Sequence, residues 1–257
     1  MRCFHEKGSL VRAACVLALA LPLLAPTPGS AQDEDLRSGR SGRGFFQAGF
    51  LRLDVDDINS ALAGSGFPTL DRSTVTLGGG GYATRGRFVI GGEGHGLLSD
   101  AQPAADGSIQ VGLDGGFGLF KVGYLAYSES GLDVYPMVGI GGGGVSVSIV
   151  ERSAPTFQDV LADPARSSRL STGMFLLDLS VAADYRFTRR RSEDGGSGGL
   201  LVGLQAGYVF APGSTNWTLD EINGVAGGPD LGVQGLYIRL SLGGWGGREA
   251  APPEGGP

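Results

Sequence analysis

Apolar and polar residues alternate with a period of two along most of the chain beyond residue 43. This period places successive side chains on opposite faces, so it predicts β-strands with one apolar and one polar face. In the clearest stretch, seven apolar residues from Phe175 to Phe187 share one face and Asp178 lies on the other. The pattern predicts strands at 45–55, 73–83, 87–97, 108–127, 132–151, 170–187, 199–210 and 235–245.

Glycine interrupts this alternation at several places. The chain has 48 glycines, and glycine inside a strand usually marks a bend, a bulge or a close backbone approach. The parity of the predicted fifth strand slips at the run 141–144, which predicts a β-bulge there. Beyond residue 31 no segment has a long helical period or an apolar run of helical membrane-spanning length.

The links between the predicted strands alternate in length. Links 56–72, 98–107, 152–169 and 211–234 are long, whereas 84–86, 128–131 and 188–198 are mostly short. Hairpins that cross an outer membrane alternate in this way, with long loops outside and short turns in the periplasm. The sequence therefore predicts an all-β fold, a closed up-and-down antiparallel transmembrane barrel of eight strands, with both termini on the periplasmic side.

The first residues have the three-part plan of a secretory signal peptide. A basic start precedes an apolar run over 13–25, and Gly29 and Ala31 are the small residues that a signal peptidase reads. The apolar run is too short for a membrane-spanning helix. We therefore expect a cleaved signal over 1–31, a flexible polar linker over 32–43, a barrel over 44–245 and a disordered periplasmic tail over 246–257.

Charge and cysteine content narrow the functional classes. Cys3 and Cys15 both lie in the predicted signal, so the mature chain has no thiol. The chain has 20 basic and 26 acidic residues, and the signal contains three and one of them. This leaves 17 basic against 25 acidic residues, and an acidic chain is a poor candidate for binding nucleic acid.

The composition of the polar face indicates whether lipid or water surrounds the predicted barrel. A soluble eight-stranded barrel of the lipocalin type has the same alternation, but it would show water a face rich in charged residues. Here the mature chain has one lysine, Lys121, and the polar face is mostly Gly, Ser and Ala. Small residues suit a narrow interior, and aromatics near the strand ends suit a lipid-facing surface.

The segment 44–245 resembles the small bacterial outer-membrane β-barrels, such as the OmpA transmembrane domain, OmpX and OmpW. Its last strand, GLYIRLSLGGW at 235–245, is similar to the terminal strand read by the barrel assembly machinery, although residues 246–257 follow it. The resemblance implies placement in the outer membrane, contact with membrane lipid and lipopolysaccharide, and assembly by that machinery.

Eight polar residues are expected to point into the barrel. Buried charges must pair or meet water, so we expect a network of ion pairs and water that fills the lumen. The alternative is a narrow polar conduit, which the many small inward residues favour. The eight residues are Arg52, Glu93, His95, Asp114, Asp178, Asp184, Arg186 and Arg239.

A hydrolytic site around His95 is the alternative chemistry. Glu93, His95 and Ser99 share a parity, as in a catalytic triad of the kind in outer-membrane lipid A deacylases. The likeness is poor, because Leu97 stands where that family has a serine. We expect instead a rim histidine that bonds a carboxylate or water, and no catalytic residue.

The long links contain signals for short helices. The run Asp54–Asn59 is similar to a calcium loop but lacks its glycine and final glutamate, so we expect Asp56 or Asp57 to cap a helix over 58–62. Thr156 precedes a second such segment at 157–161. Thr218 and Glu221 have capping-box spacing before a third. These helices either cap the outer mouth or are incidental, and we expect no metal site and no cofactor.

These features favour a non-enzymatic outer-membrane barrel for envelope integrity, surface interaction or passage of a small solute. A lipid-modifying enzyme centred on His95 and a soluble lipocalin-like carrier in the periplasm are the alternatives.

Overall fold

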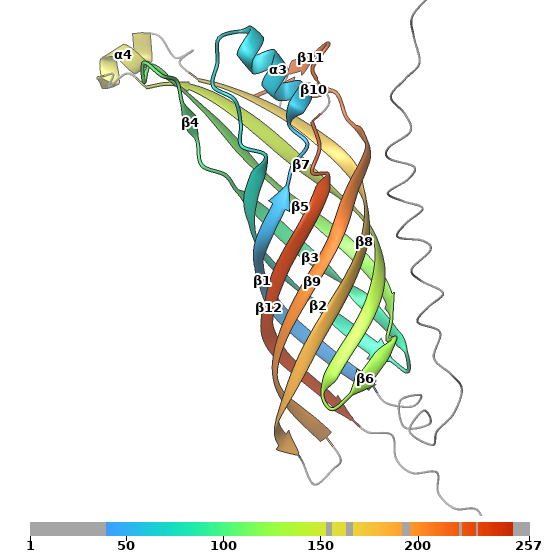
Figure 1. Cartoon of the computed structure of the whole chain (residues 1–257). Coiled ribbons are helices and arrows are strands. Elements are labelled where there is room, and N and C mark those ends of the chain that lie inside the picture. Colours follow the sequence, from blue (N-terminus) through green and yellow to red (C-terminus); the bar gives the residue numbers. More distant parts are fainter. Residues whose placement is uncertain are drawn as a thin grey trace, which may run out of the picture.

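Eight long antiparallel strands form a closed barrel in the computed structural model (Figure 1). The structure describes residues 40–152, 156–162, 167–191, 196–220, 223–229 and 231–248. The long strands are β1 (Arg40–Arg52), β2 (Ser73–Arg85), β3 (Phe88–Leu98), β5 (Ile109–Tyr124), β7 (Leu132–Glu151), β8 (Ser167–Arg191), β9 (Gly196–Ser214) and β12 (Gly235–Arg248).

The barrel closes because its first and last long strands pair. Each long strand pairs with the next one along the chain, and β1 pairs with β12 from Arg40–Arg248 to Leu51–Tyr237. Pairing of β7 with β8 completes the circle. The predicted fold class, a closed antiparallel barrel of eight strands, is confirmed.

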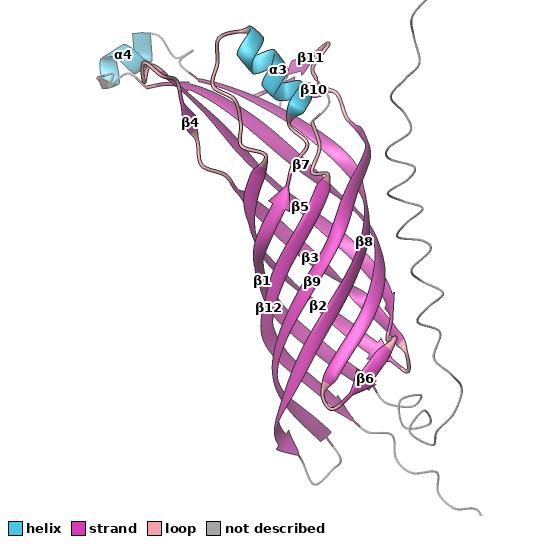
Figure 2. Cartoon of the chain, viewed as in Figure 1, coloured by secondary structure: helices cyan, strands magenta, loops and turns pink. Residues whose placement is uncertain are grey.

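The remaining elements are short, and most of them lie at one end (Figure 2). They are α3 (Asp56–Gly64), β4 (Gln102–Pro103), β6 (Tyr127–Glu129), α4 (Phe157–Ala162), β10 (Trp217–Leu219) and β11 (Asn223–Val225). We call the end with the long connections the outer end and the opposite end the periplasmic end. No helix in the described residues is long and apolar enough to cross a membrane.

Two predicted boundaries are wrong at the periplasmic end. Residues 40–43, expected in the linker, belong to β1, and residues 246–248, expected in the tail, belong to β12. The two extensions support each other, because Arg40 pairs with Arg248 and Gly42 with Gly246. The predicted signal, residues 32–39 of the linker and residues 249–257 of the tail lie outside the described residues.

Large apolar side chains cover the outward face of the wall on every long strand. Because the parity of each strand is regular, the opposite face points into the barrel. Apolar residues outside and polar residues inside are the arrangement of a barrel that crosses lipid. Exposed examples, one from each strand, are Phe46, Leu77, Phe88, Phe120, Val138, Leu179, Leu204 and Leu240.

This polarity is inverted in the outer parts of β5, β7 and β8, which continue beyond the other strands (Figure 1). Lower on β7, Val138 and Ile140 point outward. Further up, Ser146 and Ser148 take the outward positions, and Val145 is buried on the inward face. The change marks the level at which the wall leaves lipid and has water outside.

The inversion explains the apparent slip at 141–144, and the predicted bulge there is wrong. The registers of β7 with β5 and with β8 run through this segment without a shift. The apolar residues change face because the surroundings change, while the backbone keeps its parity. Register shifts do occur between β8 and β9, at Phe175/Leu177 and Thr188/Arg190.

The three predicted loop helices have different outcomes. The first is present as α3, but it starts at Asp56 after Val55 and has no side-chain cap, so the predicted aspartate cap is wrong. The second is present as α4, where Thr156 and Asp159 bond each other in the predicted capping position. The third is wrong at Thr218, which lies in β10 and pairs with β8.

Glycines of β2 and β3 provide a test of which face of each strand points into the barrel. A Cβ at the inward Gly78 would collide with the Gly94 carbonyl oxygen, whereas a Cβ at the outward Gly94 has its nearest neighbour, the Phe117 oxygen, at 3.8 Å. We expect Gly78→Ala to lower the free energy of unfolding by about 1–3 kcal/mol. Gly94→Ala should change it by less than about 0.5 kcal/mol. Urea titration of the heat-modifiable folded form in detergent measures both, and equal midpoints would contradict the assigned faces.

Candidate functional site

Four ionised side chains meet at the centre of the barrel, and we call Glu93, Lys121, Asp178 and Arg239 the central ion cluster. The ammonium of Lys121 lies 2.9 Å from Glu93 Oε1 and 2.9 Å from Asp178 Oδ1. Arg239 Nη1 lies 2.9 Å from the same oxygen of Glu93. None of the four side chains has exposed surface, so the cluster fills this level of the lumen.

Hydrogen bonds extend the central ion cluster across the lumen. Tyr237 donates its hydroxyl to Asp178 at 2.7 Å and accepts a bond from Gln205 at 3.1 Å. Gln47 in turn donates to Gln205 at 2.7 Å and to Ser241 at 2.9 Å. These residues come from the four consecutive strands β8, β9, β12 and β1. Lys121 on β5 donates to the Tyr237 hydroxyl at 3.1 Å, and this bond links that half of the wall to the opposite side.

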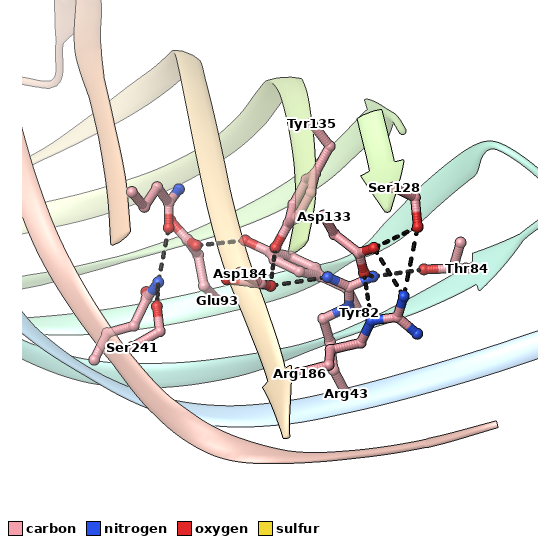
Figure 3. Close-up of polar contacts among 12 residues, drawn as sticks. Arg43, Tyr82, Thr84, Glu93, Ser128, Asp133, Tyr135, Asp184, Arg186 and Ser241 are labelled. Atoms are coloured by element: carbon pink, nitrogen blue, oxygen red, sulfur yellow. Dashed lines mark hydrogen bonds and ion pairs between the residues drawn. The ribbon is translucent and has the colours of Figure 1, made fainter. Parts of the chain in front are cut away.

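A second group, the lower ion cluster, consists of Arg43, Asp133, Asp184 and Arg186 and lies nearer the periplasmic end. Arg43 Nη1 lies 2.8 Å from Asp184 Oδ2, and its Nη2 lies 3.5 Å from Asp133 Oδ2 (Figure 3). Arg186 Nε lies 3.0 Å from the same oxygen of Asp133. Tyr135 donates its hydroxyl to Asp184.

Tyrosines connect the two clusters. Tyr82 donates to Glu93 Oε2 at 2.7 Å (Figure 3). Its ring meets the ring of Tyr135 edge-on at 6.3 Å. Polar and aromatic contacts together therefore run from the periplasmic end to the middle of the lumen.

Charge is balanced within each cluster, which has two cations and two anions. Burying an ion costs several kcal/mol, and close pairing with further hydrogen bonds offsets that cost. Loss of Lys121 would leave Asp178 without a cation, and loss of Arg43 would do the same to Asp184. These two cations are therefore the most costly to remove from their clusters.

The structure places six of the eight predicted interior residues in the lumen and two outside it. Arg52 is exposed at the outer end of β1, because the buried Leu51 has the inward parity. Asp114 is exposed on β5, 4.0 Å from Arg169, in the part of the wall that has water outside. The prediction that these two point inward is wrong. The inward six are Glu93, His95, Asp178, Asp184, Arg186 and Arg239.

Sequence reasoning missed three of the eight clustered charges. Lys121 lies between the outward Phe120 and Val122, so the alternation of β5 would have placed it inside. Asp133 has the inward parity of β7. Arg43 was assigned to the linker, and only its pairing with β2 and β12 shows that it is part of the wall.

The triad considered as the alternative does not assemble, and the expected rim position of His95 is wrong. His95 is buried in the lumen, with its ring 5.2 Å from the ring of Phe117 and Nε2 3.6 Å from Glu93 Oε1. Its nitrogens have no hydrogen-bond partner among the described residues. Ser99 lies four positions further on, about 13 Å along an extended chain, and its hydroxyl is 2.8 Å from that of Thr74.

An apolar cluster fills the lumen above the central ion cluster, and we call it the apolar plug. Val111, Leu176 and Val209 have an exposed fraction of 0%. A residue that lines a water-filled channel is exposed to that water, so the lumen is closed at this level. The plug comprises Leu51, Leu97, Val111, Leu113, Phe117, Leu119, Val145, Val147, Met174, Leu176, Val209 and Val233.

Helix α3 closes the outer mouth. Its Ile58 and Leu62 are buried in the same cluster as the apolar plug. Asn59 fixes the helix to the following loop, donating to the Leu70 oxygen at 2.9 Å and accepting from the Leu70 nitrogen at 2.7 Å. Helix α4 lies away from the mouth at the tip of the extended wall (Figure 1), so it takes no part in the cap.

We call the structure above the lipid-facing band the outer domain: the outer parts of β5, β7 and β8 with α3, β4, α4, β10 and β11. Among its described residues the exposed surface is acidic, since four arginines (Arg52, Arg72, Arg152 and Arg169) stand against a larger set of carboxylates. These are Asp54, Asp56, Asp57, Asp71, Asp100, Asp106, Asp114, Glu151, Asp159 and Asp220.

Hydrogen bonds keep one of these carboxylates ionised, and two loops form a depression on the surface of the outer domain. Hydrogen bonds from the backbone and hydroxyl of Ser108 hold the pKa of Asp106 below its usual value, so it stays ionised. A depression of about 390 Å³ lies between 66–69 and 102–105. Among the described residues no group of three or more His, Cys, Asp or Glu side chains could hold a metal ion.

Comparisons with known proteins identify no family. No family model matches the chain, and no curated protein matches it significantly. Among solved structures, the attachment invasion locus protein Ail of Yersinia pestis is 8% identical, with a TM-score of 0.42 over 82% of this chain and 99% of that one. The fold rests on the strand registers of this chain.

Two further solved structures are similar at the same low level. The outer membrane protein AlkL is 13% identical, with a TM-score of 0.35 over 90% of this chain and 98% of that one. The outer membrane protease OmpT of Escherichia coli is 10% identical, with a TM-score of 0.35 over 82% and 96%. Their different descriptions give no basis for transferring one activity to this chain.

The central ion cluster predicts a large effect of Lys121→Met. The substitution leaves Asp178 without its cation and weakens the pairing of Glu93, so we expect a loss of about 3–5 kcal/mol in the free energy of unfolding. The exposed Asp114 is the control, and Asp114→Asn should cost less than about 0.5 kcal/mol. Urea unfolding in detergent, followed by tryptophan fluorescence, measures both, and a neutral Lys121→Met would refute the cluster's structural role.

Proposed function

We propose that the chain is a bacterial outer-membrane barrel with a sealed lumen, and that it works through its outer domain as a surface-interaction protein. One observation carries this proposal. The lumen is filled from the lower ion cluster to α3, while β5, β7 and β8 continue past the lipid-facing band into an ordered domain. A barrel built to pass solutes would need a wet path through these levels.

Passage of a small solute has less support than surface interaction. The side chains of Lys121 and Arg239 at the central level have no exposed surface, and Leu51 above them is 0% exposed. A solute would have to break paired charges and then displace the apolar plug. Envelope integrity remains compatible with a rigid, filled barrel, but it does not account for the outer domain.

An enzymatic role also has little support. His95 is enclosed by Glu93, Phe117 and the apolar plug, so a lipid ester outside the wall has no access to it. Ser99, the serine of the alternative triad, lies four positions further on, about 13 Å along an extended chain. We therefore propose a non-catalytic role.

The sealed lumen predicts the behaviour of the barrel in planar bilayers. We expect no unitary conductance steps from the purified mature chain, because no water-wide path crosses the three filled levels. The same preparation must show heat-modifiable mobility after reconstitution, which demonstrates that the barrel is folded and inserted. Regular steps of one amplitude would contradict the sealed lumen.

The acidic outer domain predicts binding to cationic surfaces. In zwitterionic nanodiscs, the chain should bind poly-L-lysine but not heparin, and salt should weaken the binding. Asp57→Asn with Asp100→Asn should reduce it by about twofold per charge, the scale of an exposed ion pair. Glu129→Gln on the periplasmic β6 is the matched control. If all variants bind alike, the outer surface is not the binding face.

A further inference from the structure

Two arginines lie side by side at the periplasmic end of adjacent strands. Arg40 on β1 is the register partner of Arg85 on β2. Arg40 and Arg85 are exposed and have the outward parity of their strands. The barrel wall therefore presents a row of positive charge on the side that faces the membrane.

This row is not neutralised by the described part of the chain. Like charges directly opposite each other on neighbouring strands are destabilising. The arginines of the lumen all contact carboxylates, and the exposed Arg72 pairs with Asp56 at 2.6 Å. Within the described residues Arg40 and Arg85 have no such partner. An anion from outside the chain would remove the repulsion.

Aromatic residues show at which level the row stands. Phe88 on β3 is the register partner of Arg85. Its ring packs edge-on against that of Tyr124 at 6.1 Å, and both residues are exposed. Belts of exposed aromatic side chains mark the boundary between lipid and water in transmembrane barrels. The arginines thus lie at the level of the lipid headgroups.

Above the arginines, the outward face of β1 and β2 has almost no side chains. We call Gly42, Gly44, Gly81 and Ala83 the bare strip. The next large outward residue on β1 is Phe46, about 20 Å along the strand from Arg40. A Cβ at Gly42 would meet nothing within 4 Å. The packing of the barrel therefore does not require glycine at that position, and the strip leaves room against the wall.

We propose that this surface binds an anionic phospholipid of the periplasmic leaflet. Arg40 and Arg85 hold the phosphate, and an acyl chain lies along the bare strip. Guanidinium groups bind phosphate oxygens with strong, directional, charge-assisted hydrogen bonds. Both charge and position favour this occupant, since the row faces the headgroup level directly below the apolar band. The inference rests on the proposed placement of the barrel in the membrane.

Native mass spectrometry of the folded mature chain tests the proposal. The chain is released from nanodiscs of phosphatidylglycerol and phosphatidylcholine in equal amounts, and the retained lipids are counted. We expect phosphatidylglycerol to be enriched. Arg40→Gln with Arg85→Gln should lower the enrichment by about fivefold per arginine. Arg52→Gln with Arg169→Gln, at two exposed arginines of the outer end, should leave it unchanged.

A second variant tests the role of the bare strip independently of the arginine charges. Gly42→Leu adds an outward side chain where nothing opposes it, and we expect it to reduce the retained phosphatidylglycerol without changing the folded fraction. Unchanged retention in Gly42→Leu would overturn the binding of an acyl chain there. Retention lost equally in the Arg52/Arg169 control would show general attraction to the membrane and overturn the site.

A result that refutes the membrane placement can be distinguished from one that refutes the phospholipid site. A chain without heat-modifiable mobility, or one that stays soluble and outside the nanodiscs, would refute the proposed function itself. A folded, inserted barrel that retains both lipids in equal amounts would refute the phospholipid site alone.

Discussion

Closure of the sheet between β1 and β12 is the constraint on which the rest of the structure depends. Lipid offers no hydrogen bonds, so a sheet that crosses it must pair all its backbone groups and have no edges. The register from Arg40–Arg248 to Leu51–Tyr237 removes both edges. Eight strands closed in this way leave a lumen only wide enough for side chains. The inward residues must therefore fill the space and satisfy one another.

The medium outside the wall explains why the inward residues are polar in one part of a strand and apolar in another. Where lipid lies outside, charges can only be inside, and they occur as the complete central and lower ion clusters. Where water lies outside, the apolar residues turn inward and form the plug beneath α3. Strand β7 changes from one pattern to the other without a change in backbone parity. The sealed lumen results from both patterns together.

A barrel with a sealed lumen can interact with other molecules only through its surfaces. The outer surface is acidic and structured, with carboxylates around α3 and β4. The periplasmic rim of β1 and β2 has the opposite charge, in Arg40 and Arg85. The filled interior keeps both surfaces at fixed positions relative to the membrane, because the ion clusters connect strands on opposite sides of the wall. The rigid interior and the positions of the two charged surfaces are thus linked.

The sequence by itself determined the number and order of the long strands and most of their faces, because a period of two is a local property of successive side chains. It also indicated that Glu93, Asp178 and Arg239 would be inside. Only the tertiary structure decided their partners. Arg239 reaches Glu93 across 146 positions, a pairing that depends on the summed register of several strands. The level at which the wall leaves lipid likewise decided that Asp114 faces water, since alternation cannot show where a membrane ends.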